Sequence, residues 1–305
     1  MKWSTCLVAI ALTATIASPA AITAAGRADD NDEKYPVKDS ERIQRSITFT
    51  GAGPHRLDID NVFGSIQVAA HDGASVELTV TKTLMAATQE RLEAARKEVT
   101  LDVKEEPSLI SLYVDGPFRD CDCNRDADGR RRRNGTRWRD RQYEVRYDFV
   151  LKVPRRVGLT LSTVNRGDIK IEGTTGDFEV TNVNGGIEML DIAGSGRVGT
   201  INKDVRIVFR TNPAGPSSFK TLNGDVVVSF QPPLAADLRM KTFNGGMYTD
   251  FDTTALPALT AVSERKEGKF VYKSDRSAGV RVGGGGPELR FETLNGDIRI
   301  LQRRK

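Results

Sequence analysis

The sequence predicts a mainly β protein, in which a single-stranded parallel β-helix, or β-solenoid, follows an N-terminal strand–helix–strand element. Three observations predict it. A motif of the form Thr/Asn, apolar, Asn, Gly/Lys, Asp/Gly, apolar returns six times between positions 163 and 298, earlier segments alternate apolar and polar residues, and one segment alone has convincing helical periodicity. A recurrence near every twenty residues is typical of folds whose successive coils stack on one another.

Residues 1–25 have the composition of a secretory signal peptide. A positively charged start precedes an apolar stretch over 7–16, and small residues ending at Ala25 follow. The apolar stretch is shorter than a membrane-spanning helix, and no later segment approaches that length. We therefore expect an exported chain without a transmembrane segment after processing, in the periplasm, at the cell surface or secreted. Cys6 within the apolar stretch leaves a lipoprotein as the alternative.

Residues 26–44 have no apolar periodicity and are predicted to form a disordered leader. Residues 45–155 are predicted to form a β-rich region with one helix. Apolar and polar residues alternate as in strands over 57–68, 76–82 and 143–153. Over 86–98 the spacing of Leu92, Ala95 and the following Val99 instead indicates a helix. A charged insertion over 117–141 interrupts the strands.

The repeats are predicted to fill residues 156–305. The copies are 163–169 (with Arg166 inserted), 182–187, 200–205, 221–226, 242–247 and 293–298. The first five central asparagines, from Asn165 to Asn244, are 19, 18, 21 and 21 residues apart. The gap from Asn244 to Asn295 is 51 residues, which predicts one or two degenerate coils between them, with strands near 270–272 and 280–282.

The polar centre of each copy is predicted to be a corner at which the chain turns from one strand into the next. Asparagine and glycine tolerate positive φ, and equivalent asparagines of stacked coils are expected to form an amide ladder. The predicted turn ladder consists of Asn165, Asn184, Asn202, Asn223, Asn244 and Asn295 with Gly185, Gly224, Gly245 and Gly296. Two apolar columns are predicted to point inward, one made of Val164, Val183, Ile201, Leu222, Phe243 and Leu294 and the other of Ile169, Ile187, Val205, Val226, Met247 and Ile298.

With these repeats the chain resembles the bacterial envelope family known as putative adhesins, a largely uncharacterised group with β-solenoid domains. The resemblance covers residues 45–301 and rests on the Asn-Gly-Asp-apolar repeats, the segment 150–154 entering the first coil, and the strand, helix and strand before it. It implies an extracytoplasmic, non-enzymatic binding or scaffold role. The chain departs from the family pattern at Arg166, at Lys203 and in the insertion 117–141, where an individual function is expected to reside.

Asp204 and Asp225 are candidates for a weak cation site. They share one position of the motif, so stacking would bring their carboxylates within about 4.8 Å of each other. Carboxylate and amide oxygens suit Ca²⁺, with Asn202 and Asn223 as further donors. The alternative is a pair of solvated turn carboxylates partly neutralised by Lys203.

The insertion 117–141 contains two further candidate features. Cys121 and Cys123 are candidates for a local disulfide outside the cytoplasm; the alternatives are free thiols or pairing between chains. The basic cluster consists of Arg130, Arg131, Arg132, Arg133, Arg137, Trp138, Arg139 and Arg141. It predicts binding to an anionic surface or a polysaccharide, against the alternative of a solvated loop.

The composition argues against several classes of function. The chain has two histidines and lacks Gly-x-Ser-x-Gly and His-Glu-x-x-His, so no catalytic residue is assigned. A β-helix polysaccharide lyase or hydrolase is the less favoured alternative, because Asp168, Asp204, Asp225 and Asp297 recur evenly instead of clustering at one level. A formal charge of +4 is too small to predict nucleic-acid binding, and no metal or cofactor is predicted. The expected partner is an envelope polysaccharide or another envelope protein.

Overall fold

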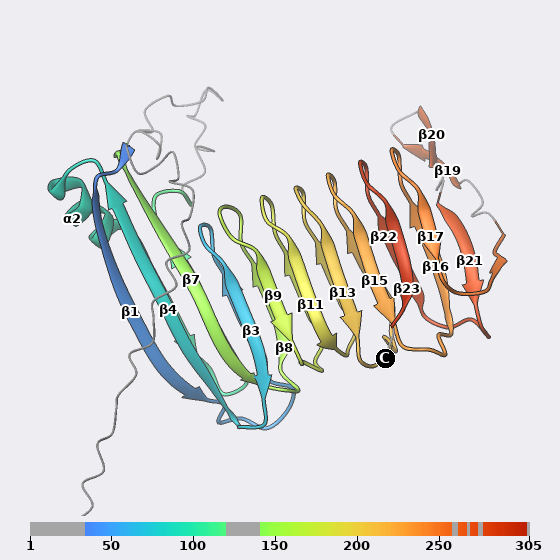
Figure 1. Ribbon diagram of the computed structural model, residues 1–305, viewed down its shortest axis with the longest axis horizontal. Coiled ribbons are helices and arrows are strands. Elements are labelled where there is room, and N and C mark those ends of the chain that lie inside the picture. Colours follow the sequence, from blue (N-terminus) through green and yellow to red (C-terminus); the bar gives the residue numbers. More distant parts are fainter. Residues whose placement is uncertain (1–33, 120–140, 258–261, 267–268, 274–276, 304–305) are drawn as a thin grey trace, which may run out of the picture.

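The computed structural model describes residues 34–119, 141–257, 262–266, 269–273 and 277–303 (Figure 1). Two large mixed β-sheets contain most of these residues, which confirms the prediction of a mainly β protein. One helix, α2 (Gln89–Glu98), lies at the N-terminal end of the sheets, within the segment predicted to be helical. The predicted signal peptide, most of the predicted leader, and the cysteines and arginines of positions 121–139 lie outside the described residues.

Sheet A has ten strands, and its first three are antiparallel. In the order of hydrogen-bonded neighbours they are β1 (Val37–Thr48), β4 (Ser75–Ala86), β7 (Tyr143–Pro154), β3 (Ile66–His71), β9 (Ile169–Glu172), β11 (Ile187–Ile192), β13 (Val205–Phe209), β15 (Val226–Phe230), β23 (Ile298–Gln302) and β17 (Met247–Thr249). From β7 to β17 every neighbouring pair is parallel.

Sheet B has eleven strands, parallel in the middle and antiparallel at both ends. In order they are β18 (Thr253–Ala255), β21 (Ala278–Val282), β16 (Ala236–Lys241), β22 (Glu288–Glu292), β14 (Ser217–Lys220), β12 (Gly196–Gly199), β10 (Phe178–Thr181), β8 (Gly158–Ser162), β2 (Arg56–Asp60), β6 (Leu109–Asp115) and β5 (Thr100–Glu105). A separate hairpin pairs β19 (Val262–Lys266) with β20 (Lys269–Lys273).

The chain alternates between the sheets in layers, each made of a sheet B strand, a polar corner and the next sheet A strand. We name each layer by its corner residue. In spatial order they are the Phe63 layer (β2, β3), the Asn165 layer (β8, β9), the Asn184 layer (β10, β11), the Asn202 layer (β12, β13), the Asn223 layer (β14, β15), the Asn295 layer (β22, β23) and the Asn244 layer (β16, β17). Figure 1 shows these layers side by side along the long axis, with the corners at the upper ends of the sheet A strands.

The order of the last two layers corrects the sequence-based prediction. The Asn295 layer lies between the Asn223 and Asn244 layers, so no degenerate coil separates Asn244 from Asn295. The strands expected near 270–272 and 280–282 exist as β20 and β21, but both pair antiparallel.

The aromatic core explains the inserted position of β22. Phe291 is fully buried, with its ring centroid 5.2 Å from that of Phe219 and 6.3 Å from that of Phe230. The residue of β16 in register with Phe291 is Met240, which cannot make these ring contacts. The inserted order therefore packs the Phe291 ring against the two rings of the Asn223 layer. The period of the repeats does not reveal that this layer favours an aromatic neighbour.

The second predicted apolar column is part of the core, but the first is not. Ile169, Ile187, Val205, Val226 and Ile298 are at most 2% exposed, whereas Ile201, Leu222 and Leu294 are 41–42% exposed and Phe243 is 78% exposed. Successive side chains of an extended chain point to opposite sides, so burying the preceding Thr turns the apolar residue outward. Met247 is also exposed, because β17 ends sheet A and no strand covers its far side.

The inward-facing member of each of six corners is a hydroxyl or amide side chain that donates to a carbonyl of the adjacent layer, and all but Thr242 are buried. The donors are Thr163, Asn182, Thr200, Thr221, Thr242 and Thr293, and their acceptors are the carbonyl oxygens of Gly64, Gly167, Gly185, Lys203, Gly296 and Gly224 respectively, at 2.7–3.0 Å. A buried carbonyl without a donor is costly, which explains why a polar side chain occupies this inward position.

Helix α2 closes the N-terminal end of the core. The hydroxyl of its N-cap Thr88 accepts from the Arg91 backbone N–H, and Leu92 and Ala95 are buried. At the other end, the Lys82 ammonium donates to the Val99 carbonyl at 2.8 Å, where the helix dipole favours a cation. Across the described ranges, no helix is both long enough and apolar enough to cross a bilayer.

Candidate functional site: the polar corner and the sheet B groove

The predicted asparagines are hydrogen-bonded in one continuous ladder along the corner edge. Each amide Nδ2 donates to the Oδ1 of the neighbouring layer, from Asn184 to Asn165 (2.6 Å), Asn202 to Asn184 (2.8 Å), Asn223 to Asn202 (2.9 Å), Asn295 to Asn223 (2.7 Å) and Asn244 to Asn295 (2.7 Å). The side chains of these asparagines thus bond mainly to one another along the stack, so the motif has a structural role.

The corner glycines are required by close backbone approach. A Cβ at Gly185, Gly224, Gly245 or Gly296 would lie 1.9–2.2 Å from a carbonyl oxygen of the adjacent layer. No carbon atom fits at that distance, so the glycine position follows from the stacking of the layers.

The aspartates of the motif are also bonded between layers. The Oδ1 atoms of Asp168, Asp204, Asp225 and Asp297 accept from the backbone N–H groups of Gly186, Asp225, Asp297 and Gly246 respectively, at 2.8–2.9 Å. The Gly246 N–H, followed by the Arg299 guanidinium, lowers the pKa of Asp297. Asp204 and Asp225 therefore lie in adjacent layers as the cation hypothesis required. Within the described part of the chain, however, no three His, Cys, Asp or Glu residues form a group able to hold a metal ion.

The two departures from the motif form ion pairs. Arg166, with φ of 58°, places its Nε 3.1 Å from Oε1 of Glu144, whose side chain is 8% exposed. Lys203 reaches back across the Asn184 layer to Asp168, with Nζ 3.3 Å from Oδ1. Arg166 thus connects the repeats to β7, and Lys203 ties two layers that do not touch through their own corners.

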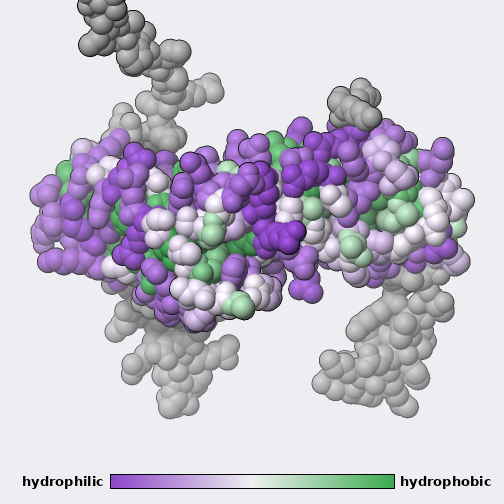
Figure 2. Space-filling model, turned by 90° about the horizontal axis from the view of Figure 1, so that it is seen from below, coloured by the Kyte–Doolittle hydropathy of each residue, from purple (hydrophilic) through white to green (hydrophobic). Residues whose placement is uncertain are grey.

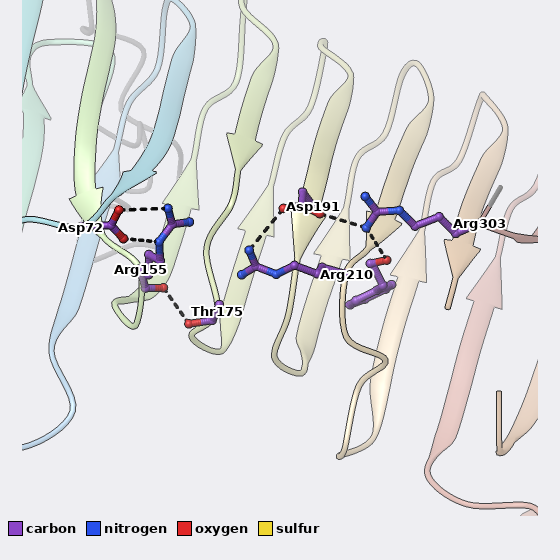
Figure 3. A network of polar contacts seen from close by, with 7 residues as sticks. Asp72, Arg155, Thr175, Asp191, Arg210 and Arg303 are labelled. Carbon is purple, nitrogen blue, oxygen red and sulfur yellow. Dashed lines mark hydrogen bonds and ion pairs between the residues drawn. The ribbon is translucent and has the colours of Figure 1, made fainter. Parts of the chain in front are cut away.

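The edge opposite the asparagines has a second polar network, formed by residues that follow or end the sheet A strands (Figure 3). Asp191 accepts from Arg210 at 3.3 Å and from Arg303 at 2.9 Å, and Arg303 also donates to the Phe209 carbonyl. Hydrophilic residues cover most of this side of the molecule, with smaller hydrophobic areas between them (Figure 2). The network anchors the end of β23 to layers that come much earlier in the sequence.

Beside this edge, the outer face of sheet B contains a groove with a volume of about 890 Å³. It runs across the starts of β8, β10, β12 and β14, and its small residues include Gly158, Gly196 and Ser218. The charged groups that line it are Arg56, Arg156, Arg197, Arg290, Asp177, Glu179 and Glu288. None of these residues was predicted from the sequence. Along each sheet B strand the polar residues that alternate with buried ones point outward, and this alternation was the available signal.

The charges of the groove are only partly paired. Arg56 binds Asp58 with an Nε–Oδ1 distance of 3.2 Å, and Arg290 binds Glu288 with an Nε–Oε1 distance of 2.6 Å. The side chains of Arg156 and Arg197 form no ion pair or hydrogen bond with any residue that the structure describes. The groove therefore offers two exposed guanidinium groups without an acceptor among the described residues.

The arginine and cysteine candidates of the insertion cannot be placed, apart from one residue at its end. Arg141 is described and contacts Glu98 of α2, which also accepts from the Tyr143 hydroxyl at 2.5 Å. Burial raises the pKa of Tyr143. The contacts of Glu98 with Arg141 and Tyr143 therefore connect α2 to β7.

No protein-family profile matches the chain, and no curated protein matches it. Solved structures with detectable similarity include a putative cell adhesion protein from Clostridium sporogenes ATCC 15579, at 8% identity over 87% of this chain and 100% of that chain, with a TM-score of 0.41. A putative adhesin from Bacteroides fragilis NCTC 9343 has 11% identity, covers 86% of this chain and 97% of its own, and has a TM-score of 0.35. A putative lipid binding protein from Parabacteroides distasonis ATCC 8503 has 10% identity, covers 88% and 97%, and has a TM-score of 0.21. Similarities this remote assign neither a family nor a function.

Proposed function

We propose that this protein is an exported, non-enzymatic β-solenoid that binds or scaffolds components of the bacterial cell envelope. One observation carries the proposal. The three polar rows of the corner, namely the Asn amides, the Asp carboxylates and the buried Thr or Asn donors, each bond the next layer along the stack. The polar side chains that recur most regularly in the sequence therefore serve to hold neighbouring layers together.

The in-register parallel pairing of both sheets supports the solenoid. Between the Phe63 and Asn244 layers, each layer pairs with its neighbours in sheet A and in sheet B. Antiparallel strands cover the parallel layers at both ends of sheet B and at the N-terminal end of sheet A, as terminal elements of repeat proteins do.

The absence of catalysis is part of the proposal and has a direct test. A polysaccharide lyase or hydrolase of this shape would need carboxylates concentrated at one level, whereas the Asp row is spread over four layers and bonded to backbone N–H groups. We expect no new reducing ends and no unsaturated products when the protein is incubated with polygalacturonate, alginate or hyaluronan. Cleavage by the natural chain that is lost in Asp225→Asn would overturn the proposal.

The export element is tested separately by cell fractionation. The natural chain should be found outside the cytoplasm and shortened at its N-terminus, and a chain beginning at residue 26 should remain inside. N-terminal sequencing of the exported protein identifies the cleavage point. Recovery of the unshortened chain from the cytoplasm would contradict the proposal.

A further inference from the structure

We infer that the outer face of sheet B binds an acidic polysaccharide along a row of donors on adjacent strands. This inference rests on the proposed binding role and names its site and ligand class. The row consists of Arg197 on β12, Ser218 on β14, Arg290 on β22 and Arg239 on β16, which are direct partners in the sheet register. Neighbouring strands lie about 4.8 Å apart, so the row spans about 14 Å of surface.

Two members of the row have buried donors without an acceptor. Ser218 Oγ, in the groove, and Nε and Nη1 of Arg239, next to its end, are buried and make no hydrogen bond with any residue that the structure describes. Buried polar atoms in native proteins are nearly always satisfied, so these orphans point to acceptor oxygens supplied from outside the chain.

The local packing keeps Arg239 in this position. Its side chain is 11% exposed, and Nη1 lies 2.3 Å from where a Cβ of Gly279 would be, so only glycine leaves room for it. Its ion-pair partner is Glu288, with Oε2 at 3.7 Å from its Nε, and the same carboxylate binds Arg290. The Asp237 carboxylate also lies close enough to interact electrostatically with Arg239. Nε and Nη1 of Arg239 still have no hydrogen-bonded acceptor among the described residues.

The groove determines what kind of anion fits. The Arg197 side chain is exposed and has no partner among the described residues, charged and hydroxyl side chains line the groove about it, and Phe178 in the lining is buried, at 5% exposed. No exposed phenyl or indole ring lines it to stack a base, which disfavours single-stranded nucleic acid. A groove also fits an extended chain better than a flat membrane surface.

The charge pattern favours a polymer with spaced carboxylates. Guanidinium forks and hydroxyl donors match carboxylate and hydroxyl oxygens. Glu179, which is the register neighbour of Arg197, would repel a continuous polyanion but tolerates carboxylates separated by neutral hydroxyl-bearing segments. A uronic-acid polysaccharide has this pattern.

The experiment measures binding of polygalacturonate to the natural mature chain by isothermal titration calorimetry, with dextran as the neutral polymer and phosphatidylglycerol vesicles as the anionic lipid. We expect polygalacturonate alone to bind, and more weakly as salt rises. Arg197→Gln should weaken binding about tenfold, as loss of a charged hydrogen bond predicts. Arg206→Gln is the matched control, because it removes the same charge from β13 on the other sheet and should leave binding unchanged.

Two further variants separate binding from folding. Ser218→Ala removes a buried hydroxyl that has no hydrogen-bond partner among the described residues of the free protein. It should therefore raise the melting temperature of the free protein and weaken binding of polygalacturonate. Glu179→Gln removes a repulsive charge and should leave binding equal or tighter. The inference is overturned if vesicles bind and polygalacturonate does not, if nothing binds, or if Arg206→Gln weakens binding as much as Arg197→Gln. The proposed function fails by a different result, namely new reducing ends in the bound polymer.

Discussion

The side-chain Nδ2 of Asn295 donates to Oδ1 of Asn223 at 2.7 Å, although 72 residues separate them in the chain. The same Asn295 accepts from Asn244, which precedes it by 51 residues. The layer that is last in the sequence is thus inserted between two layers that are consecutive in sequence. The stability of the C-terminal half depends on this insertion, and it leads to the first prediction.

Phe291→Ala is expected to destabilise the protein by about 3–5 kcal/mol, because it removes a fully buried ring that contacts Phe219 and Phe230 and leaves a cavity. Urea unfolding followed by circular dichroism measures the change. Phe243→Ala is the matched control. That ring is 78% exposed, so its loss should change the free energy of unfolding by less than about 0.5 kcal/mol. Equal effects would contradict the inserted order.

Thr221→Val is expected to cost about 1–3 kcal/mol, because the Lys203 carbonyl loses the hydroxyl of the buried Thr221, which donates to it at 2.8 Å. Valine keeps the shape and the β propensity, so the missing donor is the main change. Leu222→Ser, at the next position, alters a side chain that is 42% exposed and should cost much less. Greater damage from Leu222→Ser would restore the opposite assignment of inside and outside.

Gly224→Ala is expected to cost about 1–3 kcal/mol or more through overpacking, because the new Cβ would lie 2.2 Å from the Lys203 carbonyl oxygen. Thermal unfolding by calorimetry gives the change. Gly284→Ala is the control, since nothing lies within 4 Å of its Cβ position. If both variants melt with the natural chain, the layers do not approach each other as closely as the structure has them.

Asp297 should contribute acid-sensitive stability. The Gly246 N–H and Arg299 lower the pKa of Asp297 in the folded chain, so the unfolded chain binds its proton first as pH falls. The contribution is therefore present above about pH 4 and is lost as pH falls through the lowered folded value. Asp297→Asn keeps an acceptor for Gly246 but cannot titrate.

The measurement is the urea midpoint of both chains at about pH 6 and about pH 3. The natural chain should lose more stability on acidification than Asp297→Asn does. A larger loss in the variant would show that the carboxylate does not stabilise the corner.

Much of the corner was predictable because its physics is local. Asparagine and glycine at a constant period indicate turns, and the stacking of identical turns predicts the amide ladder that joins Asn202 to Asn223. The inward or outward direction of Leu222 was not predictable in the same way. Hydrophobicity favours burying it, but the backbone carbonyl of Lys203 in the adjacent layer accepts from the Thr221 hydroxyl, and a leucine side chain has no donor to offer.

The residues of the groove could not be predicted from the sequence for a different reason. Arg197, Ser218, Arg290 and Arg239 lie on four strands that are adjacent in space but out of chain order. Their spacing in the sequence carries no period that would unite them. Only the pairing of β22 with both β14 and β16 places the orphan donors in one row.

The sequence by itself determined the mainly β character, the repeated corners and their turn chemistry, because these depend on backbone preferences and on alternation within a few residues. The tertiary structure alone decided which layers are neighbours, which side of each corner is buried, and which outward side chains share a surface. Those features depend on contacts between segments that carry equivalent motifs, so local preferences do not distinguish one arrangement of the layers from another. Ring packing and hydrogen bonds to backbone carbonyls decide which arrangement forms.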